Sequence, residues 1–380
     1  MNDSFSERSL TMNNIVSEKS HSARNFGIDA LRILSMMMIL TLHVLNKGGI
    51  LYNVTSFSLR YYVAWLLEIL CYCAVNCYGL ISGYVGIKSK PKISSFALLW
   101  LRVVFYTLLI TLVFSFIMPD KISVKHWLCA VFPVANKQYW YFTAYAGAYL
   151  FTPLLNTAIN TLPKKDLRNS LIIITCVFSA YYSISFKITG NDFFILQSGY
   201  CILWLMILYA IGGYIRLYEP FKNIKKPVLF LIYFMSAALS WLSKIAIDYI
   251  NSAFSVNTKL QMVLVQYTSP TILICAVSLL LLFSSMNFKG ISSKIIAFFS
   301  PSSFSVYLIH THPLFWTYFI TDRFTTYKSF DSIIMTLCVI GTVIAIYLIC
   351  SFADMIRELL FKLLHLKQLL KKLDNLFQTG

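Results

Sequence analysis

Charged residues are scarce in this chain of 380 residues: they make up 12% of the sequence, against 58% hydrophobic residues. Soluble domains contain about 25% charged residues. The mean hydropathy is strongly positive, at +0.69. A water-soluble globular fold is therefore excluded, and the composition is that of a protein that crosses a membrane several times.

Acidic residues are scarcer than basic ones, with 15 Asp and Glu against 32 Lys and Arg, which gives a formal net charge of +17. Nucleic-acid binding would require a soluble basic domain, and no stretch between the apolar segments is long enough to form one. The excess positive charge fits loops that face anionic lipid at the cytosolic surface of a membrane.

Cysteine spacing for a metal site or a disulfide framework is also lacking, although the chain has nine cysteines. Cys71, Cys73 and Cys77 do not have zinc-ribbon spacing, and we interpret them as small buried apolar residues. The polar first 23 residues contain no apolar core of a signal peptide. We expect a disordered cytosolic lead over 1–23.

Apolar segments long enough to cross a bilayer, about 20 residues each, are what the chain does contain. We count ten, over 27–46, 60–86, 95–118, 138–160, 168–187, 195–217, 227–248, 261–285, 296–320 and 331–352. Basic residues are roughly twice as frequent on one side of these segments as on the other, and the richer side is cytosolic. The sequence predicts an all-α polytopic bundle of about ten transmembrane helices with both termini in the cytosol. Leucines and lysines at helical spacing over 353–380 predict a basic amphipathic tail.

The first apolar segment carries three ionisable side chains, Asp29, Arg32 and His43. Ionisable groups are costly inside a bilayer, so they usually face the interior of a bundle and serve a function. On a helix all three share one face, with Arg32 and His43 about 16 Å apart along the axis. The charge bias places His43 near the outer surface, where an imidazole can serve as general base or acyl carrier. A histidine satisfied by a helix neighbour at the interface is the alternative.

The second segment contains a carboxylate, Glu68, with Asn76 two turns later on much the same face. These two side chains either orient the reacting groups or form a buried structural pair. Gly79 and Gly83 flank Ser82 and create a small-residue surface. Such a surface favours close helix packing, and close approach of the backbone to a ligand is the alternative.

Arg102 and Trp140 are candidate ligand contacts in the next two segments. Arg102 follows a cluster of basic residues over 88–92, and its planar guanidinium suits phosphate. Snorkelling of Arg102 to the inner leaflet is the alternative. Trp140 opens the fourth segment within an aromatic run, where an interfacial belt is typical and a carbohydrate-stacking surface is the alternative.

The ninth segment places Ser303, Tyr307 and His310 on one helical face. A polar stripe on an apolar helix must find partners inside the bundle. A zinc site that joins His310 to His43 would lack a carboxylate or thiolate at metal-motif spacing. We therefore expect no metal.

These motifs, in this order, resemble the acyltransferase family 3 membrane proteins, which O-acylate bacterial surface polysaccharides and related acceptors. The similarity covers about 24–352. It lies in Asp29–Arg32 followed by His43, in Tyr78–Tyr84, in Trp140–Phe142 before Pro153, and in Ser303–His310. Three positions depart from the family pattern, since Gly79 replaces an aromatic residue, Ser305 replaces a glycine and Leu99 replaces the first of two arginines.

The resemblance implies an integral-membrane O-acetyltransferase domain over 24–352 in a bacterial cytoplasmic membrane. It implies acetyl-CoA as co-substrate without a bound cofactor, and as acceptor a hydroxyl of a cell-surface or lipid-linked polysaccharide. Arg32 and Arg102 would bind acyl-CoA, and Asp29, Arg32, His43 and Glu68 would take part in catalysis. The expected cavity lining is Asn76, Ser82, Trp140, Ser303, Tyr307 and His310. The alternative is a transporter or flippase of a glycan lipid, because intramembrane charges serve transport as well.

Overall fold

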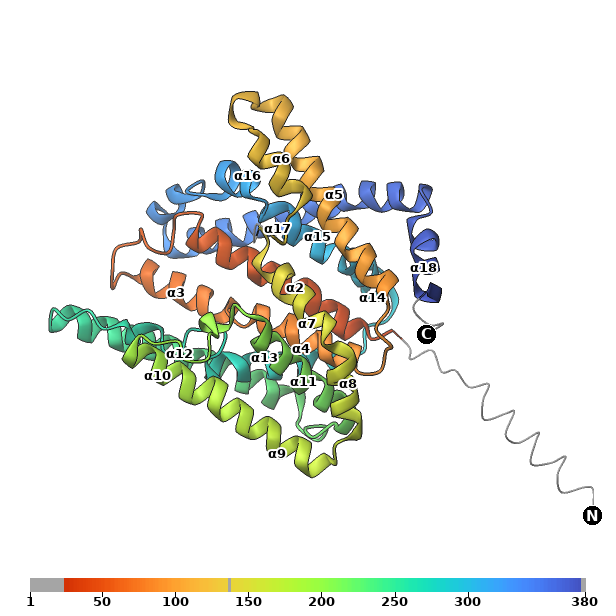
Figure 1. Cartoon of the computed structure of the whole chain (residues 1–380). Helices are drawn as coiled ribbons and strands as arrows, with labels where there is room; N and C mark the ends of the chain where they lie inside the picture. The colour runs from red at the N-terminus through yellow and green to blue at the C-terminus, as the bar shows by residue number, and fades with distance from the viewer. Residues whose placement is uncertain (1–23, 136–137, 377–380) are drawn as a thin grey trace, which may run out of the picture.

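The computed structural model describes residues 24–135 and 138–376, and all regular elements within them are helical, as predicted (Figure 1). The lead predicted over 1–23 lies outside the described residues. In the first half of the chain the α-helices are α2 (Phe26–Asn46), α3 (Leu59–Cys71), α4 (Ala74–Gly86), α5 (Ile93–Ile117), α6 (Val124–Val131), α7 (Trp140–Leu150), α8 (Thr152–Thr161), α9 (Lys164–Thr175) and α10 (Tyr182–Thr189). In the second half they are α11 (Ile202–Tyr218), α12 (Lys226–Ala253), α13 (Pro270–Ser284), α14 (Gly290–Phe299), α15 (Ser303–His310), α16 (Pro313–Phe315), α17 (Ser332–Leu363) and α18 (Leu366–Leu376).

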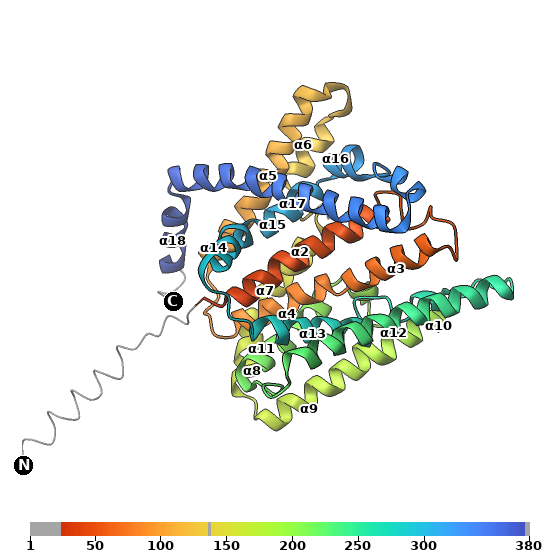
Figure 2. The ribbon, with the colours of Figure 1, turned by 180° about the vertical axis from the view of Figure 1, so that it is seen from behind.

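Helix α2 runs through the middle of the bundle, as Figures 1 and 2 show from opposite sides. It begins where the Asn25 side chain accepts hydrogen bonds from the backbone N–H groups of Gly27 and Ile28, which satisfies donors that the first turn cannot pair internally. Leu31 and Leu40 are fully buried. Helices α3, α4, α13, α14, α15 and α17 pack around α2, so its polar side chains must face cavities inside the bundle.

Six helical segments of the described chain are long and apolar enough to cross a membrane. They are α2, the pair α3–α4, α5, the pair α9–α10, α12 and α17. The ten spans and the orientation of the termini predicted from the sequence are not confirmed. Helices α11 and α13 have 17 and 15 residues, and the predicted spans over 138–160 and 296–320 are divided into shorter helices. The protein is a multi-pass membrane protein.

Close backbone contact between α4 and α11 explains two of the glycines. A Cβ atom on Gly83 would lie 1.9 Å from the carbonyl oxygen of Tyr209, and one on Gly212 would lie 2.1 Å from that of Leu80. No larger side chain fits at either position without moving a helix. Gly83 therefore serves helix packing, the first of the two interpretations of this small-residue surface.

The C-terminal helix α17 continues through the boundary predicted at residue 353, and the amphipathic segment is the separate helix α18. Helix α18 turns back onto the start of α5. The carboxylate of Asp374 accepts hydrogen bonds from the Ser94 backbone N–H at 2.9 Å and from the Ser94 hydroxyl at 2.6 Å. Lys92, the N-cap residue of α5, makes no side-chain cap, so Asp374 supplies the missing anion at this helix N-terminus.

Candidate functional site

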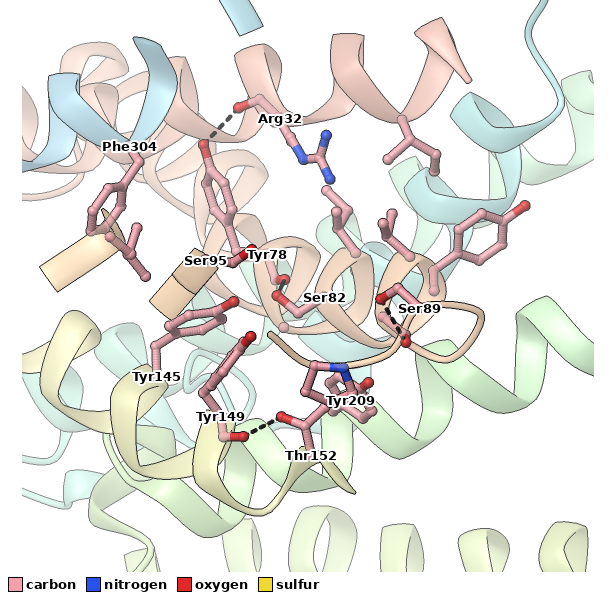
Figure 3. Close-up of a pocket in the computed structure, with 18 of the residues that line it drawn as sticks. Arg32, Tyr78, Ser82, Ser89, Ser95, Tyr145, Tyr149, Thr152, Tyr209 and Phe304 are labelled. Carbon is pink, nitrogen blue, oxygen red and sulfur yellow. Dashed lines mark hydrogen bonds between the residues drawn. The ribbon is translucent and has the colours of Figure 1, made fainter. Parts of the chain in front are cut away.

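A large cavity of about 1020 Å³ opens at the end of the bundle where α2 begins. Its walls come from α2, α4, α5, α7, α11 and the loop between α4 and α5 (Figure 3). Six basic side chains line it, and Asp29 is the one acidic side chain in the lining: the basic residues are Arg24, Arg32, Lys88, Lys90, Lys92 and Arg216. A cavity of this size and charge suits a large polyanionic ligand.

Asp29 organises the basic wall of this cavity. Its side chain accepts hydrogen bonds from Arg32 at 2.6 Å, Arg24 at 2.5 Å and the Ser300 hydroxyl at 3.2 Å. The Asp29 side chain is 6% exposed, whereas that of Arg32 is 33% exposed. The pairing therefore offsets the cost of burying the carboxylate while part of the Arg32 guanidinium still faces the cavity.

Tyrosines cover the cavity wall opposite α2. Tyr141, Tyr145 and Tyr149 follow one another at helical spacing on α7, with ring centroids 6.3 and 6.2 Å apart. Figure 3 shows Tyr145 and Tyr149 on this wall and Tyr78 reaching toward α2. There the Tyr78 hydroxyl donates a hydrogen bond of 2.8 Å to the Arg32 carbonyl.

A second, small pocket of about 50 Å³ lies farther along α2, beside His43. Its wall includes the predicted residues Trp140 and Tyr307. Three side chains line both the large cavity and the small pocket, namely Tyr78, Tyr141 and Phe304. These three aromatic rings are the boundary between the two spaces.

His43 and His310 form a direct hydrogen-bonded pair. The distance from His43 Nδ1 to His310 Nε2 is 2.9 Å. His310 is fully buried, and its Nδ1 lies 2.6 Å from the Val306 carbonyl oxygen. The indole of Trp316 meets the His43 ring edge-on, with centroids 4.7 Å apart. Both imidazoles are thus fixed in position.

The hydrogen-bond chain assigns the tautomers of the two histidines. A carbonyl oxygen can only accept, so His310 Nδ1 carries the proton that it donates to Val306. In the neutral imidazole His310 Nε2 is then an acceptor, and His43 Nδ1 must donate to it. His43 Nε2 is left unprotonated, with its lone pair free. The pair therefore presents one basic nitrogen beside the small pocket.

The other predicted residues divide between this region and the rest of the bundle. Ser82 and Ser303 line the large cavity. Asn76 lines neither space: its amide donates to the Tyr267 carbonyl at 2.7 Å, and its oxygen accepts from the Trp204 indole at 3.0 Å. Asn76 therefore joins α4 to α11 and to the loop before α13.

Arg102 and Glu68 are also outside both spaces. Arg102 points toward the start of α15, where one guanidinium nitrogen lies 3.4 Å from the Pro301 carbonyl oxygen. Glu68 is 3% exposed and makes no hydrogen bond with any residue that the structure describes. The chain breaks between α3 and α4 at Tyr72 and Cys73, so Glu68 and Asn76 do not share one continuous helical face.

Sequence reasoning missed the aromatic partners of His43. Trp316 follows His310 across a break in the helix, so helical spacing gives no signal for this contact. Tyr78 and Tyr141 lie within the motifs Tyr78–Tyr84 and Trp140–Phe142, but aromatic residues are too numerous in this chain for the sequence to single them out as neighbours of His43. Within the described residues, no group of three or more His, Cys, Asp or Glu side chains is placed to hold a metal ion.

Comparison with known proteins gives one match. A family model described as an acyltransferase domain matches residues 25–352, which include all but the last part of α17, α18 and the residues before Asn25. Neither the curated proteins nor the solved structures contain a match to this chain.

Proposed function

Because the chain belongs to the acyltransferase 3 family, we propose that it is an O-acetyltransferase of a bacterial cytoplasmic membrane. It transfers the acetyl group of acetyl-CoA to a hydroxyl of a cell-surface or lipid-linked polysaccharide. The observation that carries the proposal is the pairing of a basic cavity with a small pocket at the free Nε2 of His43. The family match also favours an enzyme over the alternative of a glycan-lipid transporter.

The large cavity is the proposed donor site. Coenzyme A carries several phosphate charges, and the cavity offers six basic side chains within about 1020 Å³. Arg32 keeps part of its guanidinium open to the cavity while it pairs with Asp29. Guanidinium and ammonium groups bind phosphate oxygens through charge-assisted hydrogen bonds. Arg102 does not line the cavity, although it contacts the carbonyl oxygen of Pro301 in the cavity wall. In this proposal the lysines over 88–92 therefore take the phosphate-binding role predicted for it.

The small pocket is the proposed acetyl site, and its volume supports a short acyl group. One water-sized group needs about 10–15 Å³ of such space. A pocket of about 50 Å³ then accommodates roughly three to five small groups. An acetyl group fills this space with its carbonyl and methyl groups, and a long acyl chain does not fit. Met36, Ile39 and Val75 form the apolar part of the wall.

The reaction at His43 needs no further proton carrier. The acceptor hydroxyl gives its proton to His43 Nε2 as its oxygen attacks the thioester carbonyl. The C–S bond then breaks, and the thiolate of coenzyme A takes the proton from His43, which yields the acetyl ester and free coenzyme A. His310 stabilises the cationic intermediate state of His43 by accepting from its Nδ1. An acyl-histidine route would use the same nitrogen as nucleophile.

The test supplies radiolabelled acetyl-CoA to membranes that contain the protein and its glycan. We expect His43→Ala to lose acceptor labelling by at least roughly 100-fold, the range of general acid–base catalysis. His365→Ala is the matched control, because His365 is exposed between α17 and α18. Labelling that persists in His43→Ala would overturn the proposed role of His43. If the denatured protein itself carries the radiolabel, the acetyl group passes through a covalent acyl-histidine intermediate.

A further inference from the structure

Glu68 is a buried carboxyl group for which the described bundle provides no partner. Its side chain lies in a potential membrane span, is 3% exposed, and has an oxygen, Oε2, enclosed without a hydrogen bond. Removing such a group from water without a partner is unfavourable. By contrast, buried Lys244 pairs its charge with the carboxylate of Asp248. Glu68 is therefore in the state expected of a group that awaits a ligand.

A cluster of aromatic side chains extends from the end of α3, one turn after Glu68, to the His43 pocket. The outer aromatic cluster consists of Tyr72, Trp140, Tyr200 and Tyr267. Ring centroids are 4.5 Å apart for Trp140 and Tyr200, 4.8 Å for Tyr200 and Tyr267, and 5.1 Å for Tyr72 and Tyr267. Tyr72, the C-cap residue of α3, follows Glu68 by four residues and so lies one helical turn away on the same face. Trp140 and Tyr267 also line the small pocket.

The outer aromatic cluster is accessible from the surface at Tyr200, which is 40% exposed. The large basic cavity opens at the end of the bundle where α2 begins. A molecule that entered beside Tyr200 would reach the His43 pocket at Trp140 and Tyr267, whereas the donor cavity meets that pocket at Tyr78, Tyr141 and Phe304.

The loop that presents Tyr200 is held in a strained conformation. Gln197, Ser198 and Gly199 all have positive φ angles, a region that residues other than glycine rarely adopt. The Ser198 hydroxyl donates to the Gln266 side-chain oxygen at 3.0 Å, while the Gln266 amide nitrogen is buried without a partner among the described residues. A second unsatisfied polar group therefore lies next to Tyr267.

We propose that Glu68 and the outer aromatic cluster bind one neutral pyranose ring of the acceptor. An aromatic ring packs against the apolar C–H face of the sugar, and Glu68 accepts a hydrogen bond from a sugar hydroxyl. Glu68 is then a binding residue that positions the sugar, and the base remains His43. This inference rests on the proposed function, since it assigns the acceptor site of the same enzyme.

Ligand protection tests the site without any need for catalysis. The full chain in lipid nanodiscs is heated with a panel of methyl hexopyranosides, and with sorbitol, an open-chain control, at the same concentration. A ligand that binds the folded state raises the melting temperature. We expect at least one pyranoside, but not sorbitol, to protect the wild type. The absence of protection by every pyranoside overturns the proposal, and so does equal protection by sorbitol, which would indicate an effect that needs no sugar ring.

Variants then locate the bound sugar. We expect Glu68→Leu to weaken binding roughly 10- to 100-fold, as for the loss of a hydrogen bond to a charged group, and Glu68→Gln to retain part of the affinity. Tyr200→Leu should weaken it roughly 2- to 10-fold through loss of the aromatic contact. Tyr249→Leu is the matched control, because Tyr249 is exposed on α12 outside the cluster. Equal affinity in all four variants would overturn the assignment.

Stability without sugar separates a binding role from a structural one. If Glu68 waits for a ligand, Glu68→Leu removes an unfavourable buried group, and the unliganded variant should melt at a higher temperature than the wild type. A lower melting temperature would mean that Glu68 supports the fold. Failure of the proposed function looks different: the wild type would release no coenzyme A from acetyl-CoA, whereas sugar protection and its loss in Glu68→Leu would remain.

Discussion

Two aspartate–arginine pairs in this protein have the same spacing and opposite states. Asp29 with Arg32 on α2 and Asp354 with Arg357 on α17 are both three residues apart on apolar helices. The Asp354 and Arg357 side chains are 0% and 4% exposed, and two hydrogen bonds of 2.7 and 3.1 Å join them. Tyr106 donates a third hydrogen bond to Asp354 at 2.7 Å. The Asp354–Arg357 pair is thus enclosed by protein, whereas a third of the Arg32 side chain is exposed to the cavity.

The difference shows that a charged pair inside a membrane protein acquires its role from what faces it. Around Asp354 the bundle supplies Tyr106 and excludes water, and Arg357 directs two of its N–H groups at the carboxylate. Around Asp29 the bundle supplies a cavity, and Arg24 and Ser300 share the carboxylate with Arg32. The carboxylate is thus satisfied while a cation stays available. We expect the Asp354–Arg357 pair to govern stability and the Asp29–Arg32 pair to govern substrate binding.

The largest expected effect is on stability. Replacing Asp354 by Ala leaves the Arg357 guanidinium buried without its carboxylate, which should lower the free energy of unfolding by about 3–5 kcal/mol. Thermal unfolding in nanodiscs, followed by circular dichroism, measures this loss. Asp29→Ala is the control, because Arg24 and Arg32 then face a water-accessible cavity. A larger loss in Asp29→Ala than in Asp354→Ala would reverse the comparison.

The next effect is on substrate binding. Replacing Arg32 by Ala should raise the KM for acetyl-CoA by roughly 10- to 100-fold, the value of one or two charge-assisted contacts to phosphate. The melting temperature should change little, because Asp29 keeps Arg24 as partner. Initial rates of coenzyme A release at varied acetyl-CoA concentrations measure the KM. Arg168→Ala, an exposed position on α9, should leave the KM at the wild-type value, and an unchanged KM in Arg32→Ala would remove the open pair from the donor site.

Removing both charges of a pair should change stability less than removing one of them. Asp354→Leu combined with Arg357→Met should restore stability to within about 1–2 kcal/mol of the wild type, because an apolar pair of similar volume often replaces a buried ion pair without loss. The matching double change at Asp29 and Arg32 should leave the KM for acetyl-CoA raised. Melting temperature and KM are read in both double variants. A KM that returned to the wild-type value in the double variant at Asp29 and Arg32 would show that this pair also acts as a structural unit.

The smallest effect concerns a third aspartate, Asp374, at the surface. Hydrogen bonds from Ser94 hold the pKa of Asp374 below its usual range. A lowered pKa means that the contact stabilises the docking of α18 above the unfolded pKa, about 3.9, and that this contribution is lost as the pH falls through the folded value. We expect amide exchange of α18 to rise slightly in Asp374→Asn at pH 7. The wild type should approach the variant near pH 3, and an identical exchange rate at pH 7 would exclude a role of Asp374 in docking.

The central helix was largely predictable from sequence, because a single straight helix fixes which side chains share a face. The spacing of Arg32 and His43 on α2 correctly predicted a cation at one end and an imidazole at the other. The polar stripe on α15 predicted that His310 finds a partner inside the bundle, but it did not identify His43 as that partner. The catalytic and binding roles assigned to these residues stay predictions.

The remainder depended on helix breaks that hydropathy does not reveal. The break at Tyr72 and Cys73 separates Glu68 from Asn76, and the break after α15 brings Trp316 back to His43. The count of ten spans was not confirmed for the same reason, because apolar composition does not distinguish one long helix from two short ones. The direction of Arg102 depends on the rotation of α5 about its axis, which its almost uniformly apolar sequence does not specify.

The rings of Tyr78, Tyr141 and Phe304 have a consequence for the membrane as an electrical insulator. They separate the wet basic cavity from the His43 pocket, so an ion on its way through would have to shed its water. An elementary charge that crosses a membrane exchanges about 2.3 kcal/mol with the field for every 100 mV. An acetyl group is uncharged. Under the proposed function, its transfer past these rings would therefore neither draw on the membrane potential nor dissipate it.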